Sequence, residues 1–549
     1  MELIFYFAGG VALFLLGMKL LTDGLKVAAG DALRTLLSKW TSGIIRGILS
    51  GILITALVQS SSAVIFATVG FVNAGLLKLR QAVYVIFGSN VGTTFTGWIV
   101  AFVGFKLDLQ LISMPVLAIG MFLWLTSGGT KRGAFGMAAA GFSVFFLGID
   151  ILKTTFETMG GVIPFEDLGS GWLDIIILVF AGMVLTTLMQ SSSAALAIVI
   201  TAVAGGLVPL EAAAAMAIGA DIGTTSTALF AVFGATSNAK RTALAHVMFN
   251  VVNGLFAIPL IGIYLSIVLW IGGPGMSVEI TVAAFHTFLK IVGLCIMIPA
   301  SGWMVRFLER LFVKDDKDEA RLKYLDENVV ETPFMAVGAL VMESKRIGRK
   351  TRKLLRKSFL DDHVKDTALK LDMRRQEISR LNMGTAEFIS TVQGVGMPDH
   401  LEHVLPDALR VLNYFEDAAD RAMMGLSLKP KSKLNPQSAK IWDDIRNTYG
   451  IFLGEADSET EGFNIDQLHE RLNELEKKYQ SFKTKLLTEG ASNTLPVREM
   501  VAWLDYGSTM RRSWDQLYKA ARYMDEFNQL IERIPGTGPE LEEELQSED

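Results

Sequence analysis

Long runs of apolar residues fill the first 305 positions of the chain. A helix needs about 20 apolar residues to cross a hydrocarbon core of roughly 30 Å, and several of these runs approach or exceed that length. The runs lie at 3–21, 43–58, 61–73, 79–103, 111–126, 134–152, 173–189, 191–204, 211–234, 242–270 and 282–305. This part of the chain is therefore predicted to be a polytopic, helical membrane segment.

Two pairs of these runs are interrupted by a short polar motif. The runs on either side of Gln59, and those on either side of Gln190, are each too short to span a membrane comfortably. Non-helical backbone at membrane depth is tolerated only where it faces protein or a water-filled cavity. Both pairs are therefore predicted to be broken or re-entrant helices.

The two interruptions belong to an internal repeat. Three motifs recur along the membrane segment at the same shift of 131 residues, without gaps. This shared register indicates two copies of one helical unit. The pairs are GILITALVQSSSA at 51–63 with GMVLTTLMQSSSA at 182–194, GSNVGTTFT at 88–96 with GADIGTTST at 219–227, and FLLG at 14–17 with FFLG at 145–148.

The charges of the connecting segments indicate how the two copies are oriented. Residues 22–46 carry a net charge of +2, whereas their counterpart 153–177 carries −3. In the next pair, 104–110 is neutral and 235–241 carries two basic residues. Because basic segments stay on the cytoplasmic side, equivalent segments are predicted to lie on opposite sides of the membrane. The prediction is an inverted repeat, as in many secondary transporters, with the N-terminus outside.

The rest of the chain has a different composition. Residues 1–314 hold 17 Lys and Arg against 13 Asp and Glu, whereas residues 315–549 hold 34 against 43. Two environments explain this contrast better than one globular core. We predict a transmembrane transport domain at 1–314 and a cytoplasmic helical domain at 315–549. Within the first, repeat one covers about 1–130, repeat two about 131–270, and a final helix follows at 282–305.

Amphipathic helices are predicted for the charged domain. Its apolar residues recur at alternating spacings of four and three, with charged residues between them. The basic residues Arg306, Arg310 and Lys314 indicate that the domain lies inside the cell. We predict a helical bundle, interrupted at 429–437 and 489–496, and an all-α chain overall. The two stripes are Leu401, Leu405, Ala408, Leu412, Phe415, Ala419 and Ala422, and Leu468, Leu472, Leu475, Tyr479, Phe482 and Leu486.

The repeated Gln-Ser-Ser-Ser motif contains the candidate anion site. A helix that begins at a mid-membrane break directs unpaired N–H groups and the positive end of its dipole toward the break. With serine hydroxyls these groups form a neutral cradle, which suits tetrahedral phosphate and still permits its release. The glutamines are expected to brace the breaks. The predicted phosphate-binding residues are Gln59, Ser60, Ser61, Ser62, Gln190, Ser191, Ser192 and Ser193.

The second repeated motif contains the candidate cation site. Its glycines permit local unwinding, and its carbonyl, hydroxyl and carboxylate oxygens suit a small cation such as sodium. Asp221 is the sharpest candidate, because an ionisable residue inside a membrane segment is costly and usually functional. The predicted sodium-binding residues are Asn90, Thr93, Thr94, Asp221, Thr224 and Thr225.

Structural roles compete with these assignments. Ser, Thr and Gly commonly pack between membrane helices, but duplication of the serine motif together with its glutamine favours a functional role. For Asp221, the alternative is a paired structural carboxylate. Two pairs with four-residue spacing are interpreted as interhelical polar contacts and not as site residues: His246 with Asn250, and His286 with Lys290.

The paired Gln-Ser-Ser-Ser and Gly-x-[Asn/Asp]-x-Gly-Thr-Thr motifs resemble those of the sodium/phosphate cotransporter family, which comprises the type II cotransporters and their bacterial relatives. The resemblance covers roughly residues 1–310. It implies sodium-coupled uptake of inorganic phosphate, with the two serine motifs where two hairpins cross. Asp221 departs from the Asn that is usual in the family, and Lys290 stands where members often carry Asn.

The tail at about 330–530 resembles a PhoU-type helical bundle, an accessory domain often fused to bacterial members of that family. Glu416-Asp-Ala-Ala-Asp420 is similar to the acid-rich motif of one three-helix half. In the other half Asp515 matches, but Arg511 stands where a Glu would be. The resemblance implies a regulatory or dimerising module, allows a homodimer, and leaves metal binding by the tail open.

These features predict a secondary active transporter that couples phosphate to sodium by alternating access in a bacterial inner (plasma) membrane. Its partners would be inorganic phosphate, sodium and the lipid bilayer, with no cofactor. The alternatives are another tetrahedral anion such as arsenate, a channel or an exporter, or a phosphate sensor that signals through the tail. An enzyme is not expected, because no nucleophile–base pair, metal cluster or Walker loop appears. The net charge of −5 without a basic stripe argues against nucleic acid.

Overall fold

In the computed structural model of the chain, the described residues form helices joined by turns and bends, without strands, which confirms the all-α prediction for them. The chain divides into two compact units, Met1–Val313 and Lys314–Asp549. The boundary predicted from composition, between residues 314 and 315, lies one residue further along the chain. The described residues are 2–41, 43–73, 77–106, 109–128, 130–160, 171–232, 235–313, 320–325, 330, 333–361, 368–395, 404–460 and 462–533.

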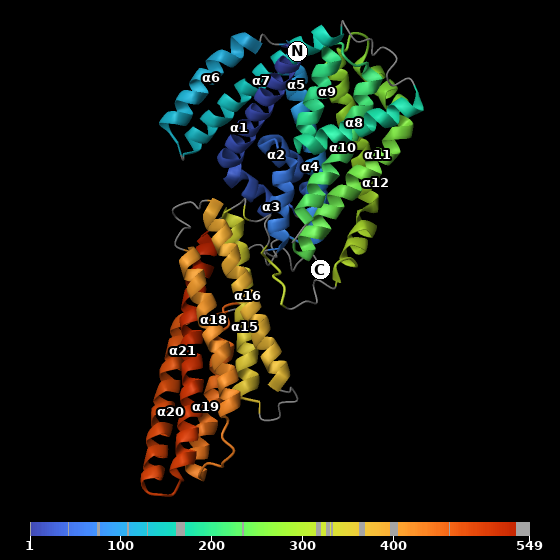
Figure 1. The fold of residues 1–549 in the computed structure, drawn as a ribbon. Coiled ribbons are helices and arrows are strands. Elements are labelled where there is room, and N and C mark those ends of the chain that lie inside the picture. The colour runs from blue at the N-terminus through green and yellow to red at the C-terminus, as the bar shows by residue number, and fades with distance from the viewer. Residues whose placement is uncertain are drawn as a thin grey trace. The chain divides into compact units, whose positions relative to one another are not determined.

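The first unit consists of packed apolar helices (Figure 1). By length and composition, six helical segments within its described residues can cross a membrane, in agreement with a polytopic protein. Its helices are α1 (Glu2–Lys39), α2 (Ile44–Val58), α3 (Ser61–Asn73), α4 (Leu79–Gly92), α5 (Thr94–Lys106), α6 (Leu109–Thr126), α7 (Lys131–Gly160), α8 (Trp172–Met189), α9 (Ser192–Ala204), α10 (Leu210–Val232), α11 (Ser237–Gly272) and α12 (Val278–Glu309).

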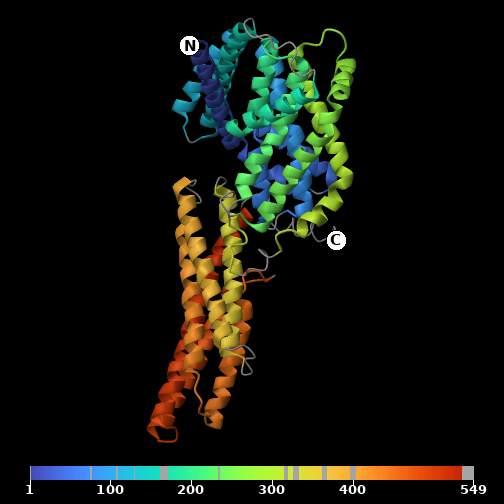
Figure 2. The same cartoon turned by 45° about the vertical axis from the view of Figure 1, so that its right-hand side comes forward.

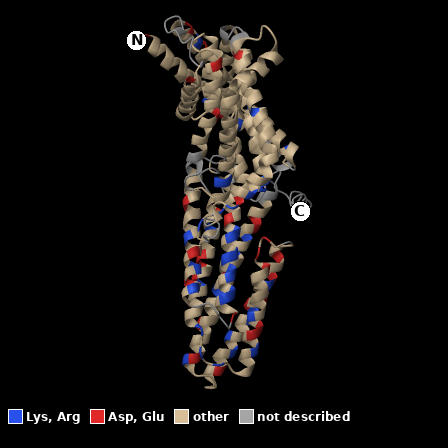
Figure 3. Cartoon of the chain, turned by 90° about the vertical axis from the view of Figure 1, so that its right-hand side faces the viewer, with Lys and Arg blue, Asp and Glu red and all other residues tan. Residues whose placement is uncertain are grey.

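The outer surface of this unit is apolar. Large hydrophobic side chains such as Leu125, Leu188 and Trp270 are at least three-quarters exposed. A soluble protein would not leave so many side chains of this kind in water, whereas lipid is their favourable surroundings. Figure 3 shows few charged residues on these helices and many on those of the second unit.

Equivalent pairs of helices in the two copies pack through equivalent residues. A Cβ atom at Gly51 of α2 would overlap the backbone of Val85 in α4. In the second copy, a Cβ at Gly182 of α8 would overlap the backbone of Met216 in α10. Each residue of the second pair follows its counterpart by 131 positions. The repeat in the sequence is therefore also a repeat of backbone packing.

The first helices of the two copies, α1 and α7, pack against each other in opposite directions. Gly17 lies against the backbone of Phe145, and its equivalent Gly148 lies against the backbone of Phe14. The rings of Phe14 and Phe145, which are also equivalent residues, are 4.8 Å apart between centroids. Reciprocal contacts of this kind arise about a two-fold axis. Equivalent helices that run antiparallel confirm the inverted repeat.

The second unit contains long helices that run side by side (Figure 2). The predicted stripes form its core: Leu412 and Phe415 of α18, and Leu475 and Phe482 of α20, are buried. Three parts of the sequence-based predictions lie outside the described part of the chain: Leu401, residues 161–170 of the acidic segment 153–177, and residues 534–549. The helices are α15 (Pro333–Phe359), α16 (Ala368–Val395), α18 (Val404–Leu428), α19 (Pro436–Glu455), α20 (Ile465–Ala491) and α21 (Val497–Arg533).

Candidate functional site

Each Gln-Ser-Ser-Ser motif breaks a membrane helix at its glutamine. Helices α2 and α8 end one residue earlier, and Gln59 and Gln190 then adopt φ values of 56° and 54°. This left-handed conformation is uncommon for a residue other than glycine, and it ends a helix. A new helix begins two residues later, α3 at Ser61 and α9 at Ser192. The helices therefore break at the residues where the sequence predicts it.

The two glutamines differ in what they contact. Gln59 is 8% exposed, and its Oε1 accepts a hydrogen bond of 2.8 Å from the hydroxyl of Thr96 in α5. Gln190 is exposed, and its Nε2 donates to the carbonyl of Thr187 in its own helix at 2.7 Å. Gln59 Nε2 also donates to the Ala56 carbonyl in its own helix at 2.5 Å, so both glutamines are fastened within their own turn and Gln59 has an additional bond to a neighbouring helix.

The serine that follows each glutamine caps the next helix. Ser60 Oγ accepts a hydrogen bond from the Ala63 N–H, and Ser191 Oγ accepts one from the Ala194 N–H, both at 3.2 Å. The remaining N–H groups of a first helical turn have no partner within the helix. Both breaks therefore present unpaired N–H groups, serine hydroxyls and a positive dipole end.

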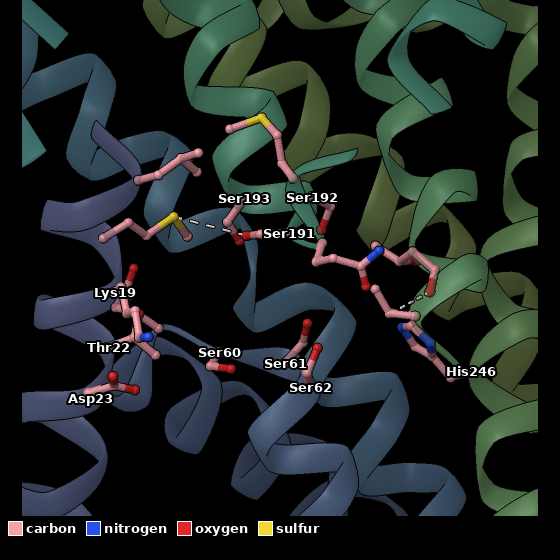
Figure 4. Close-up of a pocket in the computed structure, with 17 residues that line it drawn as sticks. Lys19, Thr22, Asp23, Ser60, Ser61, Ser62, Ser191, Ser192, Ser193 and His246 are labelled. Carbon is pink, nitrogen blue, oxygen red and sulfur yellow. Dashed lines mark hydrogen bonds between the residues drawn. The ribbon is translucent and has the colours of Figure 1, made fainter. Parts of the chain in front are cut away.

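Both motifs line one cavity of about 260 Å³. All eight residues predicted to bind phosphate are part of its wall. In Figure 4 the serines of the first copy lie across the cavity from those of the second. The other lining residues are Leu15, Met18, Lys19, Thr22 and Asp23 of α1, Met189 of α8, Thr224 and Thr227 of α10, and His246 of α11.

The sequence analysis missed the contribution of α1. Lys19 and Asp23 bring one positive and one negative side chain to the cavity wall, which is therefore not made of neutral groups alone. The residues 131 positions further on are Asp150 and Thr154, so the repeat carries no signal for them. Their four-residue spacing on the first apolar helix was the available clue.

The expected unwinding at the second motif is wrong. The first copy has a one-residue interruption at Thr93, which keeps a helical φ of −62° and ψ of −22°, and α10 runs through Thr224 and Thr225 without a break. The glycines serve close packing instead. A Cβ at Gly92 would lie 2.7 Å from the Thr55 Cβ of α2.

The polar groups of the first copy bond to backbone carbonyls three or four residues earlier in the chain. The Asn90 amide donates to the Ile86 carbonyl at 3.0 Å, and the Thr93 and Thr94 hydroxyls donate to the Asn90 and Val91 carbonyls at 2.7 and 2.8 Å. All three residues are buried. Their side-chain oxygens keep lone pairs for a cation, but these residues do not line the cavity.

Asp221 pairs with a lysine and a histidine on another helix. Its Oδ1 lies 2.9 Å from the Nζ of Lys290 and 3.1 Å from the Nε2 of His286, both on α12. All three side chains are no more than 4% exposed. Asp221 and Thr225 do not line the cavity, whereas Thr224, whose hydroxyl donates to the Asp221 carbonyl at 2.6 Å, does.

A chain of hydrogen bonds joins this ion pair to the cavity wall. Lys290 Nζ also donates to Asn250 Oδ1 at 2.9 Å, and the Asn250 amide donates to His246 Nε2 at 3.0 Å. An ammonium group only donates, so this bond fixes which end of the Asn250 amide faces each neighbour. Both pairs that the sequence analysis interpreted as interhelical contacts take part in one: His286 and Lys290 reach Asp221 on α10, and Asn250 accepts from Lys290. His246 and Asn250 also bond to each other within α11.

The acid-rich motif of the tail is occupied by arginine and amide partners. Asp420 pairs with Arg375 at 2.8 Å, and Glu416 accepts from the Asn382 amide at 2.6 Å. No group of three or more His, Cys, Asp or Glu side chains within the described residues is arranged to hold a metal ion. The likeness to a PhoU-type domain stays a prediction.

Comparison with known proteins identifies the family. The model of the Na+/Pi-cotransporter family matches residues 13–154 and 175–297, which contain both serine motifs. A Bacillus subtilis protein named "Uncharacterized protein YqeW" is 32% identical over 265 residues, 47% of this chain and 83% of that protein. The chain belongs to the Na+/Pi-cotransporter family. It is accordingly a membrane transport protein and not an enzyme.

Two further relatives of the chain have names that state a transport function. The Escherichia coli K12 protein named "Putative inorganic phosphate export protein YjbB" is 25% identical over 474 residues, 82% of this chain and 85% of that protein. The rat "Sodium-dependent phosphate transport protein 2A" is 33% identical over 124 residues, 22% of this chain and 19% of that protein. No solved structure matches the chain.

Proposed function

We propose that this transporter carries inorganic phosphate across the bacterial plasma membrane, bound between its two Gln-Ser-Ser-Ser turns and coupled to sodium. The observation that supports this most strongly is that the N-terminal turns of α3 and α9 line one cavity. Two helix starts that face one space bring two sets of unpaired N–H groups and two positive dipole ends to a single ligand. A small anion is the ligand that suits such a site.

The chemistry of the wall favours phosphate over a simple halide. A tetrahedral oxyanion has four oxygens that accept hydrogen bonds, and the six serines offer hydroxyl and backbone donors on both sides. Lys19 adds attraction for an anion, and Asp23 limits it. Because most of the donors are uncharged, the ligand is held through many weak bonds and can leave, as a transport cycle requires.

The inverted repeat supplies a route for alternating access. Rocking of one repeat against the other exposes a site between them to each side in turn. The breaks at Gln59 and Gln190 are equivalent by sequence but differ in their side-chain contacts, as expected of a transporter in one of two asymmetric states. We orient the N-terminus outside and the tail in the cytoplasm.

Sodium coupling is supported by the family and by the name of the rat relative. The candidate ligands are Asn90, Thr93 and Thr94 in repeat one, with Thr224 and Thr225 in repeat two. The hydroxyls of Thr93, Thr94 and Thr224 donate to backbone carbonyls, which leaves their oxygen lone pairs available to a cation. Thr224 also lines the cavity, so a cation there would lie next to the bound anion.

Net export is a second candidate function, favoured by the name of the Escherichia coli relative, which aligns with most of the chain. The same binding site serves either direction, because the gradients and not the site decide the direction of net flux. Export without sodium would require a different driving ion or only the phosphate gradient itself.

Uptake of radiolabelled phosphate into proteoliposomes tests the proposal. An inward sodium gradient should drive accumulation above the external concentration, whereas equal potassium or choline gradients should not. Preloaded vesicles with an outward gradient measure the reverse flux in the same preparation. Equilibration of phosphate that no sodium gradient alters would contradict symport, and the absence of any flux from folded protein would contradict transport of phosphate.

We assign a regulatory role to the PhoU-like tail. The membrane helices form a compact unit of their own, and the described residues that line the cavity belong to it. Removal of residues 330–549 should therefore leave sodium-driven uptake in place and change its rate or its response to internal phosphate. Complete loss of uptake by a truncated protein that elutes from gel filtration as a single symmetrical peak would make the tail part of the transport machinery.

A further inference from the structure

Lys290 is a buried charge inside the membrane unit, and its surroundings resemble those of a bound metal cation. Its Nζ lies 2.9 Å from the carboxylate of Asp221 on α10 and 2.9 Å from the amide oxygen of Asn250 on α11. The face of the Phe249 ring lies 5.9 Å from the same atom. Carboxylate oxygen, amide oxygen and an aromatic face are all groups that stabilise a cation.

The carboxylate has further capacity to bind a cation. Asp221 is 3% exposed, and its Oδ2 has no hydrogen-bond partner among the described residues. A buried carboxylate with one unused oxygen is costly unless positive charge stays beside it. Three helices, α10, α11 and α12, thus converge on a single positively charged position.

In the first copy of the repeat, the position equivalent to Asp221 is occupied by an uncharged residue. The equivalent of Asp221 is Asn90, whose amide donates to the carbonyl of Ile86 in its own helix at 3.0 Å. One copy is neutral because its side chain is an amide, and the other is neutral because a lysine compensates a carboxylate. The positive charge in repeat two is therefore fixed to the protein.

We propose that the Lys290 ammonium is a tethered cation that fills a cation site formed by Asp221 and Asn250. It follows that this site takes no free sodium in the natural protein. The consequence for ion coupling rests on the proposed function, since it leaves the sodium to the neutral oxygen ligands. The occupation of the site by lysine does not rest on it.

Removal of the ammonium should open the site to a free cation. Lys290→Met removes the ammonium from the buried Asp221 carboxylate and leaves the His286 imidazole beside it at 3.1 Å, so a small cation should bind in the vacated space and stabilise the folded state. The double variant Asp221→Asn with Lys290→Met is the matched control, because it also removes the buried carboxylate that would bind the cation. It also reproduces the uncharged state of repeat one.

The measurement is the melting temperature of the purified full chain in sodium chloride and in choline chloride at equal ionic strength. We expect sodium to raise the melting temperature of Lys290→Met by several degrees more than that of the wild type, and the double variant to behave like the wild type. Folding of Lys290→Met only in sodium would be the same result in stronger form.

Two outcomes would overturn the proposal. One is a folded Lys290→Met whose response to sodium equals that of the wild type. The other is a Lys290→Met that folds in no salt although the double variant folds, because no free cation could then replace the lysine. Neither outcome depends on phosphate transport, so failure of this inference and failure of the proposed function are distinguished by separate measurements.

Discussion

The two copies of the repeat share their backbone packing and their serine turns, and they differ in the contacts that their polar side chains make. Gly51 against Val85 and Gly182 against Met216 are the same contact in the same register. At the break, however, Gln59 is buried and bonded to another helix, whereas Gln190 is exposed.

The difference separates what holds the helices together from what performs transport. Close backbone approach depends on small residues and tolerates little change, so it is retained in both copies. Polar residues outside the repeated motifs are free to diverge, as Lys19 of the cavity wall and its equivalent Asp150 do, because the serine turns of both copies supply the donors for the ligand. An asymmetric pair of breaks is also the state expected when a site between inverted repeats opens to one side.

The shared packing is where substitution should have the largest effect. Gly51→Ala and Gly182→Ala each place a Cβ against the backbone of a neighbouring helix, and each should lower stability by about 1–3 kcal/mol. Gly262→Ala in α11 is the control, because its Cβ would meet nothing within 4 Å. Thermal unfolding of the purified proteins measures all three. Unequal losses at Gly51 and Gly182 would break the equivalence of the copies.

The glutamines should show the asymmetry. Gln59→Ala leaves the buried Thr96 hydroxyl without its acceptor and should cost about 1–3 kcal/mol, whereas Gln190→Ala in exposed surroundings should cost about 0.5 kcal/mol or less. Both substitutions keep a non-glycine residue at positive φ, so backbone strain cancels in the comparison. Adding Thr96→Val should recover part of the loss at Gln59 and none at Gln190, as a double-mutant cycle in thermal unfolding will show.

Lys19 should have the smallest effect, since it is an exposed charge. Lys19→Gln should weaken phosphate binding by about two- to five-fold at low ionic strength, and the difference should disappear as salt screens the charge. Lys26→Gln on the same helix is the control, because Lys26 does not line the cavity. An equal loss in both variants would mean that Lys19 acts only through the net charge of the protein.

Much of the fold followed from periodicity and register. The shift of 131 residues predicted that Gln59 and Gln190 occupy equivalent breaks, and both have the same left-handed conformation. Net loop charges predicted the inversion, which the antiparallel packing of α1 and α7 confirms. These features were predictable because each is a local or repeated property of the sequence.

The missed features depend on contacts between distant segments. Lys19 reaches the cavity from α1, and Lys290 pairs with Asp221 across 69 positions of sequence, without any repeated counterpart. The four-residue spacing of His286 and Lys290 indicated a shared face but not its partner. The expected unwinding at Gly92 was wrong because glycine permits both a distorted helix and a close neighbour, and composition does not distinguish them.

The central claim is that one phosphate is shared by the two serine turns, and equilibrium binding of radiolabelled phosphate tests it most directly. The set is the wild type, Ser61→Ala, its equivalent Ser192→Ala, and the double variant, all checked for the same melting temperature. A hydrogen bond to a charged group contributes about 1.5–3 kcal/mol, so each single change should weaken binding at least about ten-fold and the double change at least about a hundred-fold. One bound phosphate per chain is expected. Two phosphates per chain, or unchanged affinity in both single variants, would contradict it.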